Sequence, residues 1–579
     1  MANGSELTFA QTNSSLTFAA PTPQTVAFSD SIDGFTDGTS NMVLNGTQPL
    51  TIQGTTNTQT IGATNKFKNL QIIGNVTASG GANLINIAGF NILTVTGGSN
   101  FTDQGVTSSN IASIIIGDGN GGYLLKPVAD FNLNATGIEF GSQDSELGIE
   151  GNGTNITVTL NGSLDSRTSG NGNIGLNPGV NGSLTITGPA GSSLGTQGQG
   201  GNLLNQIVPS GTGDVTITPD INTVKPLLTG LVGQLILGNV NTGINFAVAT
   251  NLTVNNVTGT TDFKGQTGAL ILTDGGSLAA VTNSQAAACT LVTAVNGTIT
   301  GPISNINEVQ VNGVADTTVE FQQDISTVIL TLNNGGTADL KGSLTTTNDV
   351  EFNNGGGILQ FSGTNPAGYS FNSAVTNGQN GTLNAYTNLT STDASIGTIK
   401  TINIGQAAAP TTLTIAVNQP ALSLLAAGCA INFNDPSSTL YIQPSQAQTI
   451  TFNGNLDGTA GGGGILNFDA TNGALTLQGA TGAETVGATN PLISINLEGA
   501  NTVTLLGGAN QLSFTNGAAA LTIGGGTTFA DQSVTSASIP SITIGTVAGV
   551  GTYELDAVNG NFNLTPGVTF GNQQNLRYE

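Results

Sequence analysis

Histidine and tryptophan are absent from this 579-residue chain, and cysteine occurs only twice, as Cys289 and Cys429. Without histidine, Ser-His-Asp and Cys-His catalysis, a histidine general base and histidine-ligated metals are all excluded. Two cysteines cannot build a disulfide framework, so we expect both to be buried free thiols that pack as small apolar residues. Aromatic residues make up 5% of the chain, which argues against a stacking platform for sugars or bases.

Charge is also scarce. Charged residues form 7% of the sequence, with a net charge of −24 and nine scattered basic residues, whereas soluble domains usually contain about 25% charged residues. Nucleic-acid binding and basic amphipathic membrane helices both need clustered lysine or arginine, so neither is expected. Every apolar run is too short for a membrane-spanning helix. The first residues lack the features of a signal peptide, so any export signal should lie outside this piece.

Short strands are the dominant pattern. Runs such as Ile156–Leu160, Leu184–Thr187 and Leu413–Ile415 alternate apolar residues with threonine or asparagine, as expected for a strand with one buried face. Glycine and asparagine separate these runs. No stretch has a clear helical period, and the best helical candidates are Ser284–Val292 and Gln419–Leu425.

The fold prediction is all-β, a parallel β-helix (β-solenoid), with tandem β-sandwiches as the alternative. Hairpin pairs are few, no period near a sandwich domain's ~100 residues is visible, and turns recur at irregular gaps. Stacked coils would satisfy the backbone without charge, and asparagine could adopt left-handed turns and stack its amides at the corners. With roughly 20–25 residues per coil, the chain would form a rod of about 110–140 Å.

A long internal repeat divides the sequence. The stretch Leu50–Asn65 returns as Leu475–Asn490, with ten of 16 positions identical. The match extends in both directions, and its flanking pairs are Gln24–Gly34 with Gln448–Gly458 and Gly97–Gly117 with Gly525–Gly545. We therefore predict a first repeat unit (residues 1–150), a middle solenoid stretch (151–427) and a second, truncated copy (428–579). The pattern indicates a piece of a longer repeat protein.

The repeat also keeps two aspartates at matching positions. Asp33 recurs as Asp457, and Asp103 recurs as Asp531. Each pair could present one carboxylate per unit, or could simply cap a turn or loop. We assign no catalytic, cofactor-binding or metal-ligating residues. An isolated acidic loop is compatible with weak calcium binding, for which the sequence identifies no ligands.

Three phrases, Ile303–Gly313, Ala385–Gly405 and Gly479–Asn490, carry a family resemblance. With the overall texture of the chain, they resemble passenger regions of rickettsial surface cell antigens, the outer-membrane autotransporters that include the OmpB-type surface-layer protein. The chain departs from that family in being poorer in lysine and in lacking the signal peptide and the C-terminal translocator barrel. The resemblance implies bacterial surface localisation, anchoring through a barrel outside this piece, and a host-cell surface protein or neighbouring copies as partners.

We therefore expect a non-enzymatic cell-surface protein that acts in a surface layer or as a host-cell adhesin. The alternative is a β-helix polysaccharide-degrading enzyme. Such an enzyme uses clustered carboxylates to donate and accept protons across the glycosidic bond. A cleft with three or more converging carboxylates would distinguish it from a structural solenoid.

Overall fold

The computed structural model describes residues 11–578, except 57–58, 88, 105–112, 118–119, 128–130, 134–137, 161–163, 190–191, 196–201, 232, 286–287, 314–316, 354, 427, 461, 515–517, 533–540, 545–550, 556–567 and 571–573. These residues form short parallel strands that stack in about 20 turns of a β-solenoid. The predicted solenoid is confirmed, and the alternative of tandem sandwiches is wrong.

Alternating burial along each strand explains why the chain coils in this way. In β14 (Ile156–Leu160), every second residue is buried, and β14 pairs in parallel with β17 (Ser183–Thr187). Ile156 lies beside Leu184 in this register. Apolar residues thus stack on apolar residues from coil to coil, while threonines stack on the outer face.

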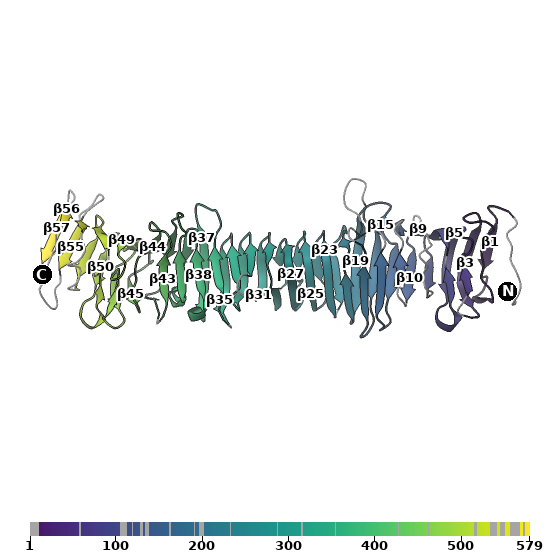
Figure 1. The fold of residues 1–579 in the computed structure, drawn as a ribbon, viewed down its shortest axis with the longest axis horizontal. Helices are drawn as coiled ribbons and strands as arrows, with labels where there is room; N and C mark the ends of the chain where they lie inside the picture. Colours follow the sequence, from purple (N-terminus) through teal and green to yellow (C-terminus); the bar gives the residue numbers. More distant parts are fainter. Residues whose placement is uncertain are drawn as a thin grey trace. The chain divides into compact units, whose positions relative to one another are not determined.

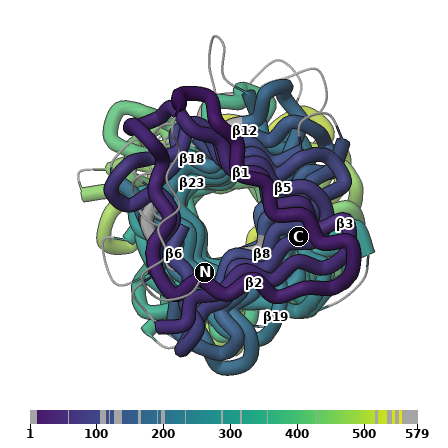
Figure 2. The backbone as a smooth tube through the Cα atoms, turned by 90° about the vertical axis from the view of Figure 1, so that its right-hand side faces the viewer, coloured from purple at the N-terminus to yellow at the C-terminus, as the bar shows by residue number. Residues whose placement is uncertain are grey.

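The chain divides into two compact units, residues 1–289 and 290–579. Figure 1 shows strands stacked side by side within each unit, and Figure 2 shows the backbone of the first unit winding round an interior. The buried apolar side chains of the coils make up the core. A long stack in the first unit includes β14, β17, β20 (Asp214–Ile217), β23 (Gln234–Val240), β25 (Thr250–Val257) and β27 (Gly268–Leu278).

Three long stacks run through the described residues of the second unit. The first includes β32 (Thr318–Phe321), β34 (Thr337–Leu340), β36 (Ile358–Phe361), β38 (Thr382–Ala385), β40 (Thr401–Ile404) and β43 (Ala430–Phe433). The second includes β33 (Ile325–Leu332), β35 (Leu344–Phe352), β37 (Tyr369–Thr376), β39 (Leu389–Ser391), β41 (Thr412–Ile415), β44 (Thr439–Ile442), β46 (Ile465–Asp469) and β49 (Leu492–Glu498). The third includes β42 (Ala421–Leu424), β45 (Gln448–Phe452), β47 (Leu475–Gly479), β50 (Thr502–Leu505) and β53 (Thr528–Asp531).

Coil length varies more than the sequence suggested. Leu235 pairs with Leu252 across a short coil, whereas Asn173 pairs with Gln206 across a coil nearly twice as long. The paired strands stay in register in both cases, so the extra residues lie in the connections. Solenoids tolerate such insertions because each coil needs only its strands to continue the stack.

The core consists mainly of Leu, Ile, Val and Phe side chains. Aromatic rings stack between neighbouring coils, with centroids 4.4 Å apart for Phe246 and Phe263 and 5.3 Å apart for Phe67 and Phe90. Burying one such side chain contributes about 1.5–3 kcal/mol. Repeated over many coils, this contribution stabilises a chain in which only 7% of the residues are charged.

The two best helical candidates are not helical in the part of the chain that the structure describes. Gln419–Leu425 contains the strand β42, and Ser284–Val292 overlaps β29 (Cys289–Thr293). In β42, Leu422 and Leu424 are buried while Ala421 and Ser423 are exposed, so the period is two. Stacking onto the next coil outweighs the helical preference of alanine, which is a weak local term. Within the described residues, no helix is long and apolar enough to cross a membrane.

Asparagine acts at the corners as predicted. Six described asparagines have a positive φ: Asn13, Asn152, Asn181, Asn305, Asn334 and Asn377. Corner amides also stack between coils: Asn333 Nδ2 donates to Asn312 Oδ1 at 2.6 Å. A second ladder of side-chain amides connects neighbouring strands of the first stack. The sequence had suggested such ladders only at the corners.

Candidate functional site

The repeated Asp33 and Asp457 both close turns. Asp457 Oδ1 accepts hydrogen bonds from the backbone N–H of Thr489 at 2.9 Å and of Asn490 at 3.3 Å. Asp33 Oδ1 makes the same pair of contacts with Thr64 and Asn65. The capping interpretation is therefore correct for this pair, because each carboxylate binds the backbone of the following coil.

Gln59 and Glu484 form a second matching pair, which the sequence analysis did not single out. Glu484 is 6% exposed and accepts hydrogen bonds from the backbone N–H of Thr481 and Ala483. Burial alone would raise the pKa of Glu484, but the hydrogen bond from the Thr481 hydroxyl, together with these backbone hydrogen bonds, outweighs it and holds that pKa below its ordinary value. Gln59 Oε1 likewise accepts from the N–H of Thr56 at 2.8 Å. The sequence signal that could have identified this pair is the alignment of Gln59 with Glu484 in the repeated stretch.

Asp103 and Asp531 are buried and are not presented at the surface. Each is the last residue of a strand, β8 (Asn100–Asp103) or β53, and each is at most 3% exposed. Asp531 Oδ2 accepts a hydrogen bond from Tyr553 Oη at 3.0 Å. The interpretation as one presented carboxylate per unit is wrong for this pair, because the strand alternation that buries Phe101 and Phe529 also turns the aspartates inward. The interpretation as a turn or loop cap stays a prediction.

The two cysteines are free thiols in different environments. Cys289 is fully buried, as expected, and its Sγ accepts a hydrogen bond from Asn283 Nδ2. Cys429 is only partly buried and lines a cavity, so the prediction of a buried thiol is wrong for this residue. Its place just before β43 puts it at the rim of the coil.

A tyrosine and a carboxylate meet at the end of β46. Tyr441 Oη donates to Asp469 Oδ2 at 2.7 Å, and Gln443 Nε2 donates to the same oxygen at 2.8 Å. Burial and the Asp469 contact raise the pKa of Tyr441, so its hydroxyl stays protonated. Glu498 lies beside Asp469 in the strand register but is exposed. Within the described residues, no group of three or more His, Cys, Asp or Glu side chains is placed to hold a metal ion.

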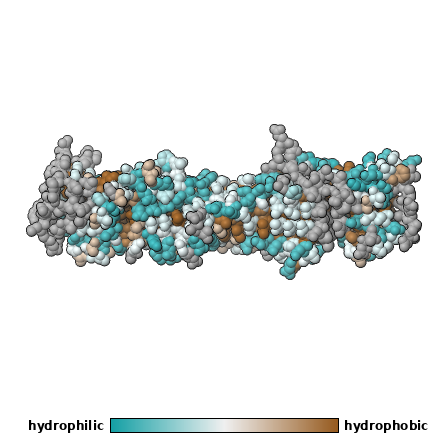
Figure 3. Space-filling model, viewed as in Figure 1, coloured by the Kyte–Doolittle hydropathy of each residue, from teal (hydrophilic) through white to brown (hydrophobic). Residues whose placement is uncertain are grey.

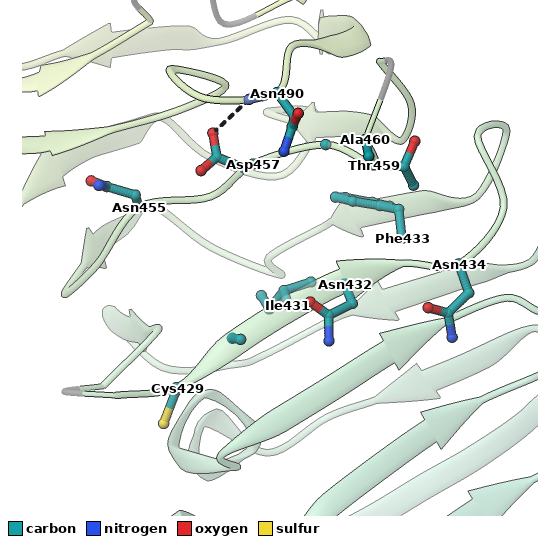
Figure 4. A pocket seen from close by; sticks show the side chains of 12 residues that line it. Cys429, Ile431, Asn432, Phe433, Asn434, Asn455, Asp457, Thr459, Ala460 and Asn490 are labelled. Atoms are coloured by element: carbon teal, nitrogen blue, oxygen red, sulfur yellow. Dashed lines mark hydrogen bonds between the residues drawn. The ribbon is translucent and has the colours of Figure 1, made fainter.

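A polar cavity of about 510 Å³ opens in the second unit, between β43 and the next coil. Figure 4 shows Ile431, Asn432 and Phe433 on one wall, with Asn455 and Asp457 on the segment opposite. The lining contains one carboxylate, Asp457, together with several amides. The cavity therefore offers hydrogen-bonding groups rather than the paired carboxylates of a glycoside hydrolase.

An amide ladder leads to this cavity along the outer face of the first stack. Asn384 Nδ2 donates to Gln360 Oε1 at 3.2 Å, Asn403 Nδ2 to Asn384 Oδ1 at 2.8 Å, and Asn432 Nδ2 to Asn403 Oδ1 at 2.9 Å. Every rung donates to the coil before it. The final carbonyl oxygen, on Asn432, accepts no hydrogen bond from a described residue.

Polar, mostly uncharged residues cover much of the molecular surface. In the face drawn in Figure 3, hydrophobic residues form small groups separated by hydrophilic ones. The large hydrophobic residues exposed among those described are scattered along the sequence: Phe35, Val180, Val224, Ile236 and Ile493. Contacts with partners would therefore rely on amides, hydroxyls and backbone groups more than on an apolar patch.

Comparison with known proteins gives one informative similarity. Over 168 residues, the chain is 32% identical to outer membrane protein B of Rickettsia japonica (strain ATCC VR-1363 / YH). The matched stretch covers 27% of this chain and 10% of that protein. No family model and no solved structure matches the chain. The sequence thus resembles part of a rickettsial outer membrane protein, in agreement with the phrase-level resemblance.

Proposed function

We propose that this chain is a segment of a non-enzymatic bacterial cell-surface protein of the autotransporter-passenger type. The observation that carries the proposal is a parallel solenoid with uncharged amide ladders on its outer face. The similarity to a rickettsial outer membrane protein supports the same assignment. In this proposal, the protein is associated with the outer membrane and works as a surface-layer component or as an adhesin for host cells.

The proposed mechanism is geometric. Each coil hydrogen-bonds to the next through its parallel strands, as in β36, β38 and β40, so backbone ladders make each unit stiff. With 7% charged residues, the faces carry little repulsion against neighbours of the same kind. The net charge of −24 still disfavours collapse onto other acidic surfaces.

Small-angle scattering of the purified chain at two concentrations tests this proposal. A rod near the length expected from stacked coils, which thickens as concentration rises, would support a coat built from neighbouring copies. A rod that stays single would favour an adhesin whose partner is a host-cell surface protein. A compact particle or a flexible string of beads would overturn the mechanical role.

Antibodies raised against the purified chain test the location. They should label intact cells of the source organism, with antibodies to a cytoplasmic protein of the same cells as the control. Labelling that requires permeabilised cells would contradict surface display. This experiment does not depend on the scattering result, so location and mechanical role are tested separately.

A further inference from the structure

The stack that ends at β43 leaves backbone groups without partners. On one side, β43 pairs in register with β40, and the N–H of Ala430 and Asn434 donate to that preceding coil. Successive residues of a strand point their backbone groups to opposite sides. The N–H and C=O of Ile431 and Phe433 therefore point toward the cavity, where they make no hydrogen bond to a described residue.

The opposite wall has the same property. Leu456 donates its N–H to Thr485 O, and its own C=O accepts from the N–H of Gly487, so both its backbone groups face the following coil. By the same alternation, the backbone groups of Asn455 and Asp457 face back toward β43. No described residue is hydrogen-bonded to them. Two rows of backbone donors and acceptors thus face each other across the cavity.

Glycine residues explain why no strand of the next coil pairs with β43. The segment between β45 and β46 contains five described glycines: Gly454, Gly458, Gly462, Gly463 and Gly464. Gly464 has a φ of +91°, and a Cβ there would meet the ring of Phe433 at 2.5 Å, so only glycine fits. Gly458 donates its N–H to Asn490 O instead of joining β43. The chain therefore passes β43 without forming a strand beside it.

The cavity has the size of a short piece of strand. A residue in a packed sheet occupies about 160 Å³, from a rise of ~3.3 Å, a strand spacing of ~4.8 Å and a sheet spacing of ~10 Å. A volume of about 510 Å³ then holds about three residues. That length matches the span from Ile431 to Phe433. The N–H and C=O groups of these two residues would form hydrogen bonds to a strand of this length.

The side chains around the cavity define what the occupant carries. The open Asn432 Oδ1 would accept a hydrogen bond from an amide, which would add one more rung to the ladder. Asp457 uses Oδ1 for its turn, and its Oδ2 accepts no hydrogen bond from a described residue. With a chain net charge of −24, this free oxygen favours a cation.

We infer that this cavity is a slot for one extended peptide strand of a partner protein, with a lysine or arginine placed against Asp457. The strand would complete the backbone hydrogen bonds of both walls, which is how an exposed sheet edge captures a peptide. The inference does not rest on surface localisation, because it concerns only groups within the second unit.

Hydrogen exchange with mass spectrometry on the full chain tests the slot. The probe is the capped hexapeptide Val-Lys-Val-Asn-Val-Thr, which is extended, carries one cation and offers one amide. In the free protein, the amides of Ile431, Phe433, Asn455 and Asp457 should exchange fast although Ile431 and Phe433 have buried side chains. Saturating peptide should slow exchange at all four, and leave exchange in the first unit unchanged.

Matched variants separate backbone pairing from charge. Alternate residues of the bound peptide direct their N–H groups to opposite walls of the cavity. N-methylation of either alternating set should therefore abolish the protection from hydrogen exchange, because one wall then loses its donors. Asp457→Asn should weaken peptide affinity about fivefold, the size of one partly exposed charge pair. Asp33→Asn changes the matching turn cap in the other unit and should leave affinity unchanged.

Three results would overturn the inference. Absence of protection at saturating peptide would show that the edge does not take a strand. Binding that survives N-methylation would show that the peptide is held by something other than backbone pairing. Protection of the same amides that grows with protein concentration, without peptide, would assign the slot to a second copy of this chain.

Discussion

Asp457 fixes the backbone of Thr489 with a 2.9 Å hydrogen bond across one coil, and the first repeat unit makes the same 2.9 Å contact between Asp33 and Thr64. The two contacts lie in different compact units of the chain. Each links the segment that ends in Asp-Gly to the segment that ends in Ala-Thr-Asn. The two repeated sequence segments thus supply the carboxylate and the backbone N–H groups of the same contact. This shared contact gives a physical reason for their similarity.

Removing this cap should loosen the following turn. We expect Asp457→Ala to destabilise the local turn by about 1–2 kcal/mol, because two backbone N–H groups lose their acceptor. Hydrogen exchange at Thr489 and Asn490 measures the change directly. Asp457→Asn keeps an acceptor oxygen and should exchange nearly as slowly as the wild type. Unchanged exchange in the alanine variant would show that the cap contributes nothing.

Glu484 should make stability depend on pH. Its folded-state pKa lies below the ordinary value, so its ionised form stabilises the fold above the unfolded pKa of about 4.3, and this contribution is lost as the pH falls through the folded pKa. Glu484→Gln removes that titration. The difference in Tm between wild type and variant should therefore be largest near pH 7 and should shrink below about pH 4.

Gln59→Glu is the reciprocal control in the first repeat unit. Gln59 Nε2 donates to Ser29 O at 3.1 Å, and an ionised glutamate would place a second acceptor against that carbonyl oxygen. This variant should be destabilised at pH 7 and should recover in acid, when the carboxyl becomes a donor. A Tm difference that is independent of pH in both variants would contradict the assignment of opposite roles.

The sequence predicted the strand periodicity well, because inward residues such as Leu235 and Leu252 alternate with polar ones over whole strands. The sequence did not predict features that depend on how a strand is oriented in the coil. Asp103 was open to a surface or turn interpretation, but the parity of its strand turns it inward beside the buried Phe101. The predicted boundaries at residues 150 and 427 remain a proposal.

The cavity left only an indirect signal in the sequence. The glycine run that ends at Gly464 was visible, but its consequence depends on which strand lies beside it, and that neighbour is about one coil away in sequence. Whether the N–H of Ile431 finds a partner is a tertiary property. Local patterns predict a strand and its buried face, but they do not show whether the next coil continues the stack.

An asparagine inside the amide ladder should contribute more to local stability than the asparagine at its end. Asn384 donates a hydrogen bond to Gln360 and accepts one from Asn403, whereas the Asn432 side chain donates only to Asn403 in the coil before it. We expect Asn384→Ala to lower the free energy of local opening by about 2 kcal/mol, and Asn432→Ala by about 1 kcal/mol or less. Hydrogen exchange of β38 and β40 reports this energy. Equal losses would show that the amides act independently of their place in the ladder.

Cys429 should be the thiol that reacts in the folded protein, because Cys289 is fully buried. Burial raises the pKa of the Cys429 thiol, and the nearby charge of Lys400 opposes this only in part. Since the thiolate is the reactive form, we expect one equivalent to react with a disulfide reagent, slowly at pH 7 and about tenfold faster per pH unit up to pH 9.

Cys429→Ser should abolish this reaction in the folded protein, and denaturation should then expose the single remaining thiol, Cys289. Because Cys429 lines the same cavity as Asp457, the hexapeptide probe should also slow the reaction if it occupies the slot. Two fast equivalents in the native protein would contradict the burial of Cys289. A rate that does not change with pH would contradict the raised thiol pKa of Cys429.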